Sequence, residues 1–291
     1  MELVSRKCPV CNNLLEQRAT KQYTREFFNF GPLVVKCAEC SITCLNPVMT
    51  NEEYDKFYNK DGQKEFIDKF LDVSENYEHK LSVSDYRRAM IVNNIIKVND
   101  RILDIGTGNS NFVGMVKNST GIDINKSRVD RSVTRGLDVR YCDVFDWNEP
   151  MDVVTLFHVL EHITNPIEFM YKIYEVLNKN GILVIEVPNL DDALVSLPVY
   201  SEFYYQNAHC TYFTPGTLRF LMKSCGFDVV DEIRLQRYSL NNHLYWLLKR
   251  KPGKFKGIEI LNSIYSWALK VLRKHDTIFL ICRKGEVCTR R

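Results

Sequence analysis

Short apolar segments alternate with helical stretches through the middle of the chain, and this rhythm limits the fold more than any other sequence feature. Each apolar segment has the length of a buried strand, and apolar residues recur at helical spacing in the stretches between them. Parallel strands need crossover connections of this helical kind. The pattern predicts an α/β protein with a Rossmann-like, doubly wound, seven-stranded sheet. Its strands are expected at residues 101–105, 120–124, 138–142, 152–157, 181–187, 227–235 and 277–283.

The N-terminal part of the chain differs in composition. Residues 1–48 are rich in cysteine and lack helical periodicity, which favours a small ribbon of strands and turns. Residues 49–82 are expected to form a helical connector, because their aromatic side chains recur at helical spacing. These side chains are Tyr54, Phe57, Tyr58, Phe66 and Phe70.

The main domain is expected to span residues 83–285 and to begin with a helix at Val83. A long loop follows Pro188. Residues 238–274 form two basic, amphipathic stretches, which predict a helical insertion before the last strand. Residues 286–291 are expected to be a tail.

The net charge and the cysteine count limit the partners and the cellular compartment that can be expected for the protein. A net charge of +3 is too small to favour nucleic acid, so no stable nucleic-acid partner is expected. No apolar run reaches the length of a membrane span, and the first residues do not resemble a secretory leader. The ten cysteines are therefore expected to be reduced thiols in a cytoplasmic protein.

Four cysteines form two Cys-x-x-Cys pairs separated by 25 residues. Each pair can turn two sulfurs toward one point, and two pairs complete a tetrahedral shell that suits a structural zinc ion. Four unrelated thiols and a redox motif are the alternatives. The gap has room for a hairpin with a small core of Phe27, Phe28 and Phe30. The expected ligands are Cys8, Cys11, Cys37 and Cys40.

The segment Ile102–Ser110 ends an apolar strand and opens a helix, the context of a nucleotide-binding turn. A dinucleotide and S-adenosylmethionine are the two candidate ligands. Asp104 lies where a pyrophosphate would sit, and a carboxylate there repels phosphate but attracts an amino group. The third glycine of the dinucleotide pattern is replaced by Asn111. Asp123, which ends the second strand, is placed to accept ribose hydroxyls.

These residues together resemble the first motif of class I S-adenosylmethionine-dependent methyltransferases, an acid-x-Gly-x-Gly-x-Gly in which Ser110 here replaces the last glycine. The resemblance covers residues 84–285. It implies that Asp104 and the glycines contact the methionine part, Asp123 the ribose and Asp143 the adenine. The implied cofactor-binding residues are Asp104, Gly106, Thr107, Gly108, Asp123, Ile124, Asp143, Val144, Phe157 and His158.

Two further segments resemble a large methyltransferase subgroup. Residues 157–166 are similar to its "hVLEHi-x-x-P" segment, and residues 207–215 to its "H-x-x-yFt" loop. His209 is the expected general base, because a histidine accepts a proton near neutral pH. The other candidate catalytic residues are His158, Glu161, His162 and Tyr212.

Several alternatives remain for this second group. Glu161 and His162 could simply orient their loop, and the tyrosine could be core packing. His158, Glu161 and His162 share one face of a short helical turn and could bind a divalent ion. The same three residues match a peptidase zinc motif, but they follow a strand and do not lie within a long helix.

The cysteine module, the class I domain and the insertion together resemble bacterial methyltransferases of surface-polysaccharide and sugar pathways. This resemblance implies O-methylation of a sugar hydroxyl, linked to a nucleotide or to a carrier lipid. Methylation of a phenol or nitrogen, RNA modification and a non-catalytic scaffold are the alternatives. The insertion 238–274 could also touch a membrane surface. The side chains expected at such a contact are Trp246, Leu247, Leu248 and Trp267.

Overall fold

Seven strands form the central sheet of the computed structural model, as the sequence predicts. They are β5 (Ile102–Ile105), β6 (Ser119–Asp123), β7 (Val139–Tyr141), β8 (Met151–Phe157), β9 (Leu177–Pro188), β11 (Phe227–Leu235) and β12 (Thr277–Lys284). Their order is β11-β12-β9-β8-β5-β6-β7. The strands from β9 to β7 run parallel, whereas β12 pairs antiparallel with both β9 and β11.

The structure describes residues 3–15, 33–50, 52–54, 75–249, 253–256 and 259–286. The predicted ribbon core of Phe27, Phe28 and Phe30 lies outside the described residues. So do four aromatic residues of the predicted connector, Phe57, Tyr58, Phe66 and Phe70.

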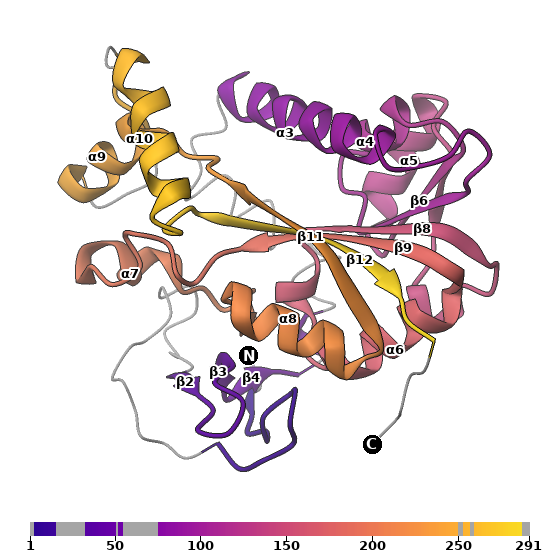
Figure 1. The fold of residues 1–291 in the computed structure, drawn as a ribbon, viewed down its shortest axis with the longest axis horizontal. Helices are drawn as coiled ribbons and strands as arrows, with labels where there is room; N and C mark the ends of the chain where they lie inside the picture. Colours follow the sequence, from indigo (N-terminus) through magenta and orange to yellow (C-terminus); the bar gives the residue numbers. More distant parts are fainter. Residues whose placement is uncertain are drawn as a thin grey trace.

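Helices cover both faces of the sheet (Figure 1). One face carries α3 (Glu75–Asn93), α4 (Asn111–Met115) and α5 (Lys126–Thr134), and the other carries α6 (Pro166–Val176) and α8 (Pro215–Ser224). The described part of α3 already includes Glu75, eight residues before the predicted Val83. Residues 75–82 are mostly polar, so they show no apolar periodicity by which their helical structure could be recognised.

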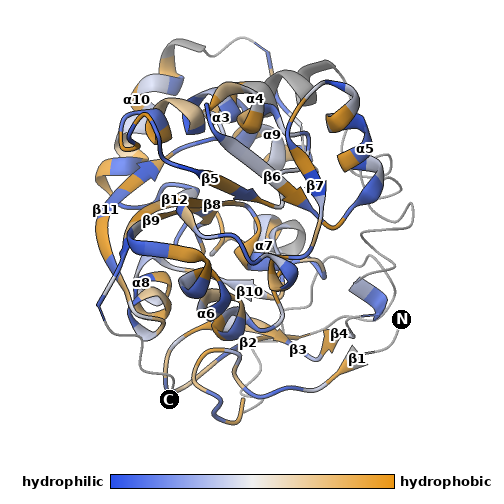
Figure 2. Cartoon of the chain, turned by 90° about the vertical axis from the view of Figure 1, so that its right-hand side faces the viewer, coloured by the Kyte–Doolittle hydropathy of each residue, from blue (hydrophilic) through white to orange (hydrophobic). Residues whose placement is uncertain are grey.

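Alternating strand residues build the two cores. Ile102 and Val153 pack with α3 and α4, whereas their neighbours Leu103 and Val154 pack with α6 and α8. A strand buried on both faces reads as a continuous apolar run, and this explains why the sheet could be predicted from sequence. Figure 2 shows these apolar strands between the two helical layers.

The N-terminal module does not stand apart from the main domain. Its short strands are β1 (Leu3–Val4), β2 (Leu33–Lys36), β3 (Thr43–Asn46) and β4 (Val48–Met49). Strands β1 and β4 pair with each other, and β2 pairs with β3. The other edge of β3 pairs with β10 (Thr211–Tyr212), a strand of the main domain.

The long loop predicted after Pro188 is therefore wrong in part, since it contains β10 and helix α7 (Pro198–Tyr204). Strand β10 has two residues and exists because β3 offers it an edge. A contact of this kind depends on the tertiary structure, so no local pattern marks it.

Two helices, α9 (Leu240–Lys249) and α10 (Glu259–Val271), lie between β11 and β12, at the position of the predicted insertion. Trp246 is buried, with its ring stacked on Tyr200 at 5.5 Å, so it is not the membrane-contacting residue expected from sequence. Leu247 is half-buried, whereas Leu248 and Trp267 are exposed. None of the described helices is long and apolar enough to cross a membrane.

Candidate functional site

The predicted cofactor residues meet at one edge of the sheet. Strand β5 lies between β6 and β8, with Ile105 opposite both Ile122 and Leu156. The turns that follow these parallel strands therefore lie side by side at their carboxyl ends. In open α/β sheets, ligands bind at this edge.

The turn after β5 is a left-handed glycine turn. Gly106 and Gly108 have φ angles of +67° and +58°, which favour glycine. A Cβ on Gly106 would lie 2.6 Å from Cγ2 of Val159, in the loop after β8. A Cβ on Gly108 would meet nothing within 4 Å. The turn is thus packed tightly on its inner side and open on its outer side, as a backbone cradle for a ligand requires.

Ser110 takes the place of the last glycine of the motif and also has a positive φ, +58°. Its buried hydroxyl forms a 2.8 Å hydrogen bond with Ser132 of α5. This bond holds a backbone conformation that a non-glycine residue rarely adopts, so the departure from the motif leaves the turn intact.

Two buried carboxylates flank the turn. Asp104 accepts a 2.6 Å hydrogen bond from the Thr155 hydroxyl, and burial raises its pKa to about 6 even though neighbouring hydroxyls oppose the shift. Asp123 accepts from the Gly108 amide at 3.0 Å and from the Asn125 amide at 2.8 Å. Asp123 therefore stabilises the turn itself, a role that the sequence did not reveal.

Of the residues predicted to bind adenine, some are exposed at the surface and one is buried in the core. Asp143 is exposed and accepts a 3.0 Å hydrogen bond from the Phe145 amide, and Ile124 is also exposed. The side chain of Val144 is buried in the core, so only its backbone can face a ligand. The ring of Phe145, by contrast, is exposed beside Asp143 and offers an apolar surface that the predicted set did not include.

Phe157 and His158 also differ in their surroundings. The Phe157 ring is buried between Phe112 and Phe279, under the guanidinium of Arg88, so its side chain belongs to the core. His158 has a φ of +59°, and its amide donates to the carbonyl of Glu186 at 2.8 Å. Its ring lies between the carboxylates of Glu161 and Glu186, next to the Arg237 guanidinium.

A buried ion network, which was not predicted, supports the backbone bend at His158. Glu186 of β9 accepts a 2.6 Å hydrogen bond from Nε of Arg88 and a 3.2 Å bond from Arg87. Burial alone would raise the pKa of Glu186, but Arg88, His158 and Arg237 hold it well below its usual value. An acid inside the apolar run Ile182–Val187 was the sequence signal for this network.

Three predicted catalytic residues form a cluster. Glu161 and His162 belong to the turn after β8, and His209 comes from the loop before β10. Their ligand-type atoms all lie within 4.8 Å of one another, and the two imidazole rings are 4.6 Å apart. The sequence placed these residues near the cofactor but did not reveal that they touch.

The electrostatics of this cluster favour proton transfer. Burial alone would raise the pKa of Glu161, but the hydrogen bond from His158 and the nearby histidines lower it to about 2. Its other oxygen, Oε2, is buried and has no hydrogen-bond partner. Burial lowers the pKa of His162, whose Nδ1 lies 2.8 Å from the Ala208 carbonyl. An ionised carboxylate thus lies beside two imidazoles.

The same three groups could hold a divalent cation, because two imidazoles and a carboxylate are common metal ligands. This set differs from the one considered at the sequence level, since His209 replaces His158. The His158 ring is engaged by Glu161 through Nδ1 and by the Arg237 guanidinium through Nε2. Both nitrogens of the His158 ring are therefore engaged by protein side chains.

Tyr212 lies close to His209, with ring centroids 6.0 Å apart, but its hydroxyl is committed to the backbone. It accepts from the Gln206 amide at 2.9 Å and donates to the Gln206 carbonyl at 3.0 Å. The structure therefore gives Tyr212 a positioning role in the loop that carries His209.

The N-terminal module fixes this loop from the other side. The Arg6 guanidinium donates to the carbonyl of Thr164 at 2.7 Å and to that of Cys210 at 2.6 Å. Thr164 follows the Glu161 turn, and Cys210 follows His209. One arginine therefore links the module to both halves of the Glu161–His162–His209 cluster, in addition to the pairing of β3 with β10.

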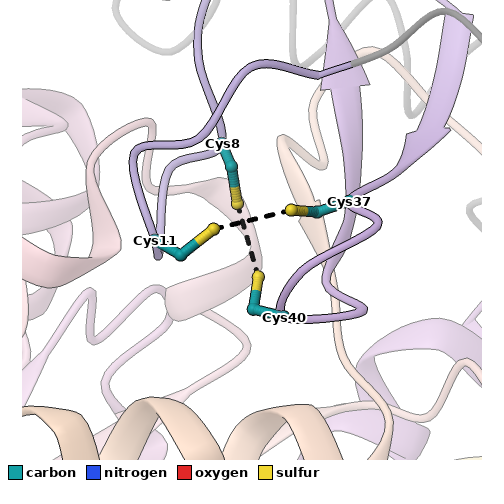
Figure 3. Close-up of side chains that lie close together, drawn as sticks. All are labelled: Cys8, Cys11, Cys37 and Cys40. Carbon is teal, nitrogen blue, oxygen red and sulfur yellow. Dashed lines mark hydrogen bonds between the residues drawn. The ribbon is translucent and has the colours of Figure 1, made fainter.

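The four predicted cysteines of the module converge on one point (Figure 3). Sγ atoms of Cys8 and Cys40 are 3.5 Å apart, as are those of Cys11 and Cys37. Disulfide sulfurs lie at about 2.05 Å, so these are thiols. A tetrahedral zinc site with Zn–S bonds of about 2.3 Å has sulfur–sulfur edges slightly longer than these separations, so the group fits such an ion.

The strand order, the single reversed strand β12 and the glycine turn define a Rossmann-like methyltransferase fold. The chain belongs to the family described as "Methyltransferase domain", whose model matches residues 66–232, more than half of the sequence. It is a methyltransferase. A comparison with curated proteins gave no match.

Solved structures of other methyltransferases share the fold. An S-adenosylmethionine-dependent methyltransferase from Archaeoglobus fulgidus is 21% identical with a TM-score of 0.51, covering 69% of this chain and 93% of that one. A didemethyltoxoflavin N1-methyltransferase from Burkholderia thailandensis, solved with S-adenosylhomocysteine, is 16% identical with a TM-score of 0.54. That match covers 86% of this chain and 97% of the other.

The link made by Arg6 can be tested by removing its side chain. Replacing Arg6 with alanine removes side-chain hydrogen bonds worth on the order of 2 kcal/mol, so the loop that precedes β10 and carries His209 should open more often. Hydrogen–deuterium exchange of peptides covering residues 207–213 should accelerate roughly tenfold or more. Arg140→Ala, which disturbs an exposed ion pair with Glu149, is the matched control. Unchanged exchange in the Arg6 variant would contradict the proposed link.

Proposed function

We propose that this methyltransferase uses S-adenosylmethionine, acts in the cytoplasm, and methylates a hydroxyl of a small polar acceptor, namely a nucleotide- or carrier-linked sugar of surface-glycan synthesis. The observation that carries the donor assignment is the left-handed turn at Gly106 and Gly108 between the carboxylates of Asp104 and Asp123. When bound, S-adenosylmethionine supplies a methyl group activated by a positively charged sulfur.

The residues around the turn suit the parts of this donor. The Asp104 carboxylate is poorly solvated, so a ligand ammonium group would stabilise its ionised form. The backbone of residues 106–108 is open to a ligand because no side chain covers Gly108. Asp123 keeps unused lone pairs for ribose hydroxyls. Ile124, Asp143 and Phe145 offer apolar and hydrogen-bonding surface for an adenine.

The same features disfavour a dinucleotide. A pyrophosphate would bring two negative charges to a turn that already has a buried carboxylate on each side. Close charges of the same sign destabilise each other most where solvent is excluded. Asp104 and Asp123 therefore support a ligand whose approaching groups are cationic or neutral.

We assign the general base to His209. Accepting a proton from the acceptor hydroxyl gives the imidazole a positive charge, and the ionised Glu161 with its unpaired Oε2 lies in the same cluster to stabilise it. His162, held by the Ala208 carbonyl, supports the cluster as a positioning residue. A histidine can take up the hydroxyl proton near neutral pH, which is the task of a general base here.

A buried aromatic cluster joins the His209 loop to the insertion. Tyr204 and Tyr205 pack against Tyr212, and Tyr204 packs on Tyr200, which stacks on Trp246 of α9. Tyr200, Tyr205, Tyr212 and Trp246 are all buried, so the cluster positions the loop and the insertion relative to each other. Arg237 beside His158 offers a cation to a phosphate of the acceptor.

The donor assignment predicts a binding experiment. S-adenosylhomocysteine should bind to the wild-type protein by calorimetry and raise its melting temperature, whereas NADH should do neither. Gly106→Ala should abolish binding, because its φ of +67° strains an alanine and its Cβ would collide with Val159. Gly216→Ala, where the nearest atom lies at 3.7 Å, should bind normally. NADH uptake without S-adenosylhomocysteine uptake would refute the proposal.

The base assignment predicts a kinetic result. His209→Ala should lower kcat by about 10² to 10⁴ and leave the affinity for S-adenosylhomocysteine unchanged. Added imidazole should restore part of the rate, which it would not do for a structural defect. If instead a chelator abolishes wild-type activity and Mn²⁺ restores it, the cluster binds a metal and His209 is a ligand.

The acceptor class can be tested with labelled S-adenosylmethionine. Nucleotide sugars should accept the label on oxygen, whereas phenols, amines and tRNA should not. Label on tRNA, or its retention by the protein at moderate salt, would favour RNA modification. Label on amines or phenols alone would support another small-molecule methyltransferase. Binding of S-adenosylhomocysteine without any turnover would favour a scaffold.

We also propose that the four-cysteine group holds a structural zinc ion. The purified protein should contain one zinc per chain, and Cys37→Ser should lose it together with thermal stability. Cys44→Ser is the matched control, because Cys44 lies in β3 outside the group of four and should retain the metal. Equal zinc content in both variants would contradict this assignment.

A further inference from the structure

The insertion between β11 and β12 concentrates the positive charge of the chain. Residues 238–274 contain eight lysines and arginines and one acidic residue, Glu259. The remaining residues hold thirty-one basic and thirty-five acidic side chains, so the rest of the chain is net negative. The exposed cations among the described residues of this segment are Lys249, Lys254, Lys256, Arg273 and Lys274.

Helix α10 has two chemically different sides. On its inner side Leu269 is buried, and the Tyr265 hydroxyl forms a 2.7 Å hydrogen bond with Nδ1 of His243 in α9. Its outer side presents four large apolar side chains spaced three and four residues apart, a stripe along the helix. They are Leu261, Ile264, Trp267 and Val271, with exposed fractions of 49%, 62%, 65% and 56%.

The α9–α10 insertion lies at the same edge of the central sheet as the candidate site. Thr277, which begins β12, pairs with Pro188 at the end of β9 and with Leu235 at the end of β11. The insertion therefore leaves the sheet at the carboxyl ends of the parallel strands, and α9 and α10 project together from that end (Figure 1). Stacking of Trp246 on Tyr200 connects the insertion to the aromatic cluster of the His209 loop.

The positive charge of the insertion and the apolar stripe on α10 together indicate which kind of partner could bind this surface. A second copy of this chain would bring another strongly basic face against the first, so like charges would oppose the contact. A nucleic acid would satisfy the cations but would leave the aliphatic stripe in water. An anionic bilayer satisfies both, because lipid headgroups attract the cations and the acyl boundary accepts Leu, Ile, Val and Trp side chains.

We propose that the α9–α10 insertion binds the surface of an anionic lipid bilayer, with Leu261, Ile264, Trp267 and Val271 inserted at the headgroup boundary. This inference goes beyond the proposed methyl transfer and holds whatever the acceptor is. It orients the candidate site toward the bilayer, where an acceptor carried on a lipid phosphate would be presented.

The protein contains its own reporter for this contact. Of its three tryptophans, Trp147 and Trp246 are buried, with exposed fractions of 4% and 6%, whereas Trp267 is exposed. Vesicles of equimolar phosphatidylglycerol and phosphatidylcholine should shift the tryptophan emission to shorter wavelength. Phosphatidylcholine vesicles should not, and high salt should reverse the shift. Trp267→Phe should abolish the shift while the emission of the two buried rings reports a normal fold.

Cosedimentation with the same vesicles tests the stripe itself. Ile264→Asp should weaken binding by at least about tenfold, because it places a charge at the headgroup boundary. Val98→Asp replaces a β-branched apolar residue outside the insertion that is even more exposed than Ile264, and this variant should bind as the wild type does.

Three results would overturn the proposal. One is equal binding by the Ile264 and Val98 variants. Another is a concentration-dependent emission shift with dimer formation in the absence of vesicles, which would identify a second copy as the partner. The third is tighter binding to RNA than to vesicles with no effect of Ile264→Asp, which would identify nucleic acid.

Discussion

The pairing of β3 with β10 is the contact on which the acceptor side of this molecule depends. Strand β10 has two residues and no partner within the main sheet, and the residues before it carry His209. Arg6 strengthens the same junction by bonding to the carbonyls of Thr164 and Cys210. A module that is separate from the main domain in the sequence thereby holds together the two loops that form the Glu161–His162–His209 cluster. If the four cysteines bind zinc, the metal acts on catalysis through this edge, since a closed shell of four sulfurs leaves no ligand position for substrate.

Four buried carboxylates organise the rest of the site, and their partners decide what each can do. Glu186 is paired with arginines and serves the fold. Asp123 accepts two backbone amides and stabilises the glycine turn, with lone pairs left for a ligand. Asp104 has a hydroxyl partner and a raised pKa, so a cation would stabilise it. Glu161 is ionised and retains an unpartnered oxygen beside two histidines. Buried charges without full compensation are costly, so the last two mark the positions at which a ligand or a proton is expected.

The sheet could be predicted because its strands are short and apolar on both faces. The glycine turn could be predicted because its residues are contiguous in the sequence. The Glu161–His162–His209 cluster could be predicted only as separate motifs, since its assembly depends on β10 finding the edge of β3. The same reason explains why α7 and β10 were read as loop. Trp246 shows the opposite error, because its sequence neighbourhood suggested a membrane contact whereas its ring is packed in a core. Glu186 was detectable, as an acid within an apolar strand.

In the arrangement that we propose, the cysteine module holds the Glu161–His162–His209 cluster at the same edge of the sheet as the glycine turn, so that donor and base meet there. The most direct measurement is a crystal structure with bound S-adenosylhomocysteine, recorded with anomalous data at the zinc edge. We expect a metal among the four sulfurs, the ligand on the turn at Gly106 and Gly108, and its sulfur directed toward Glu161 and His209. A ligand whose sulfur points away from that cluster, or a β10 loop detached from β3 in the liganded protein, would contradict it.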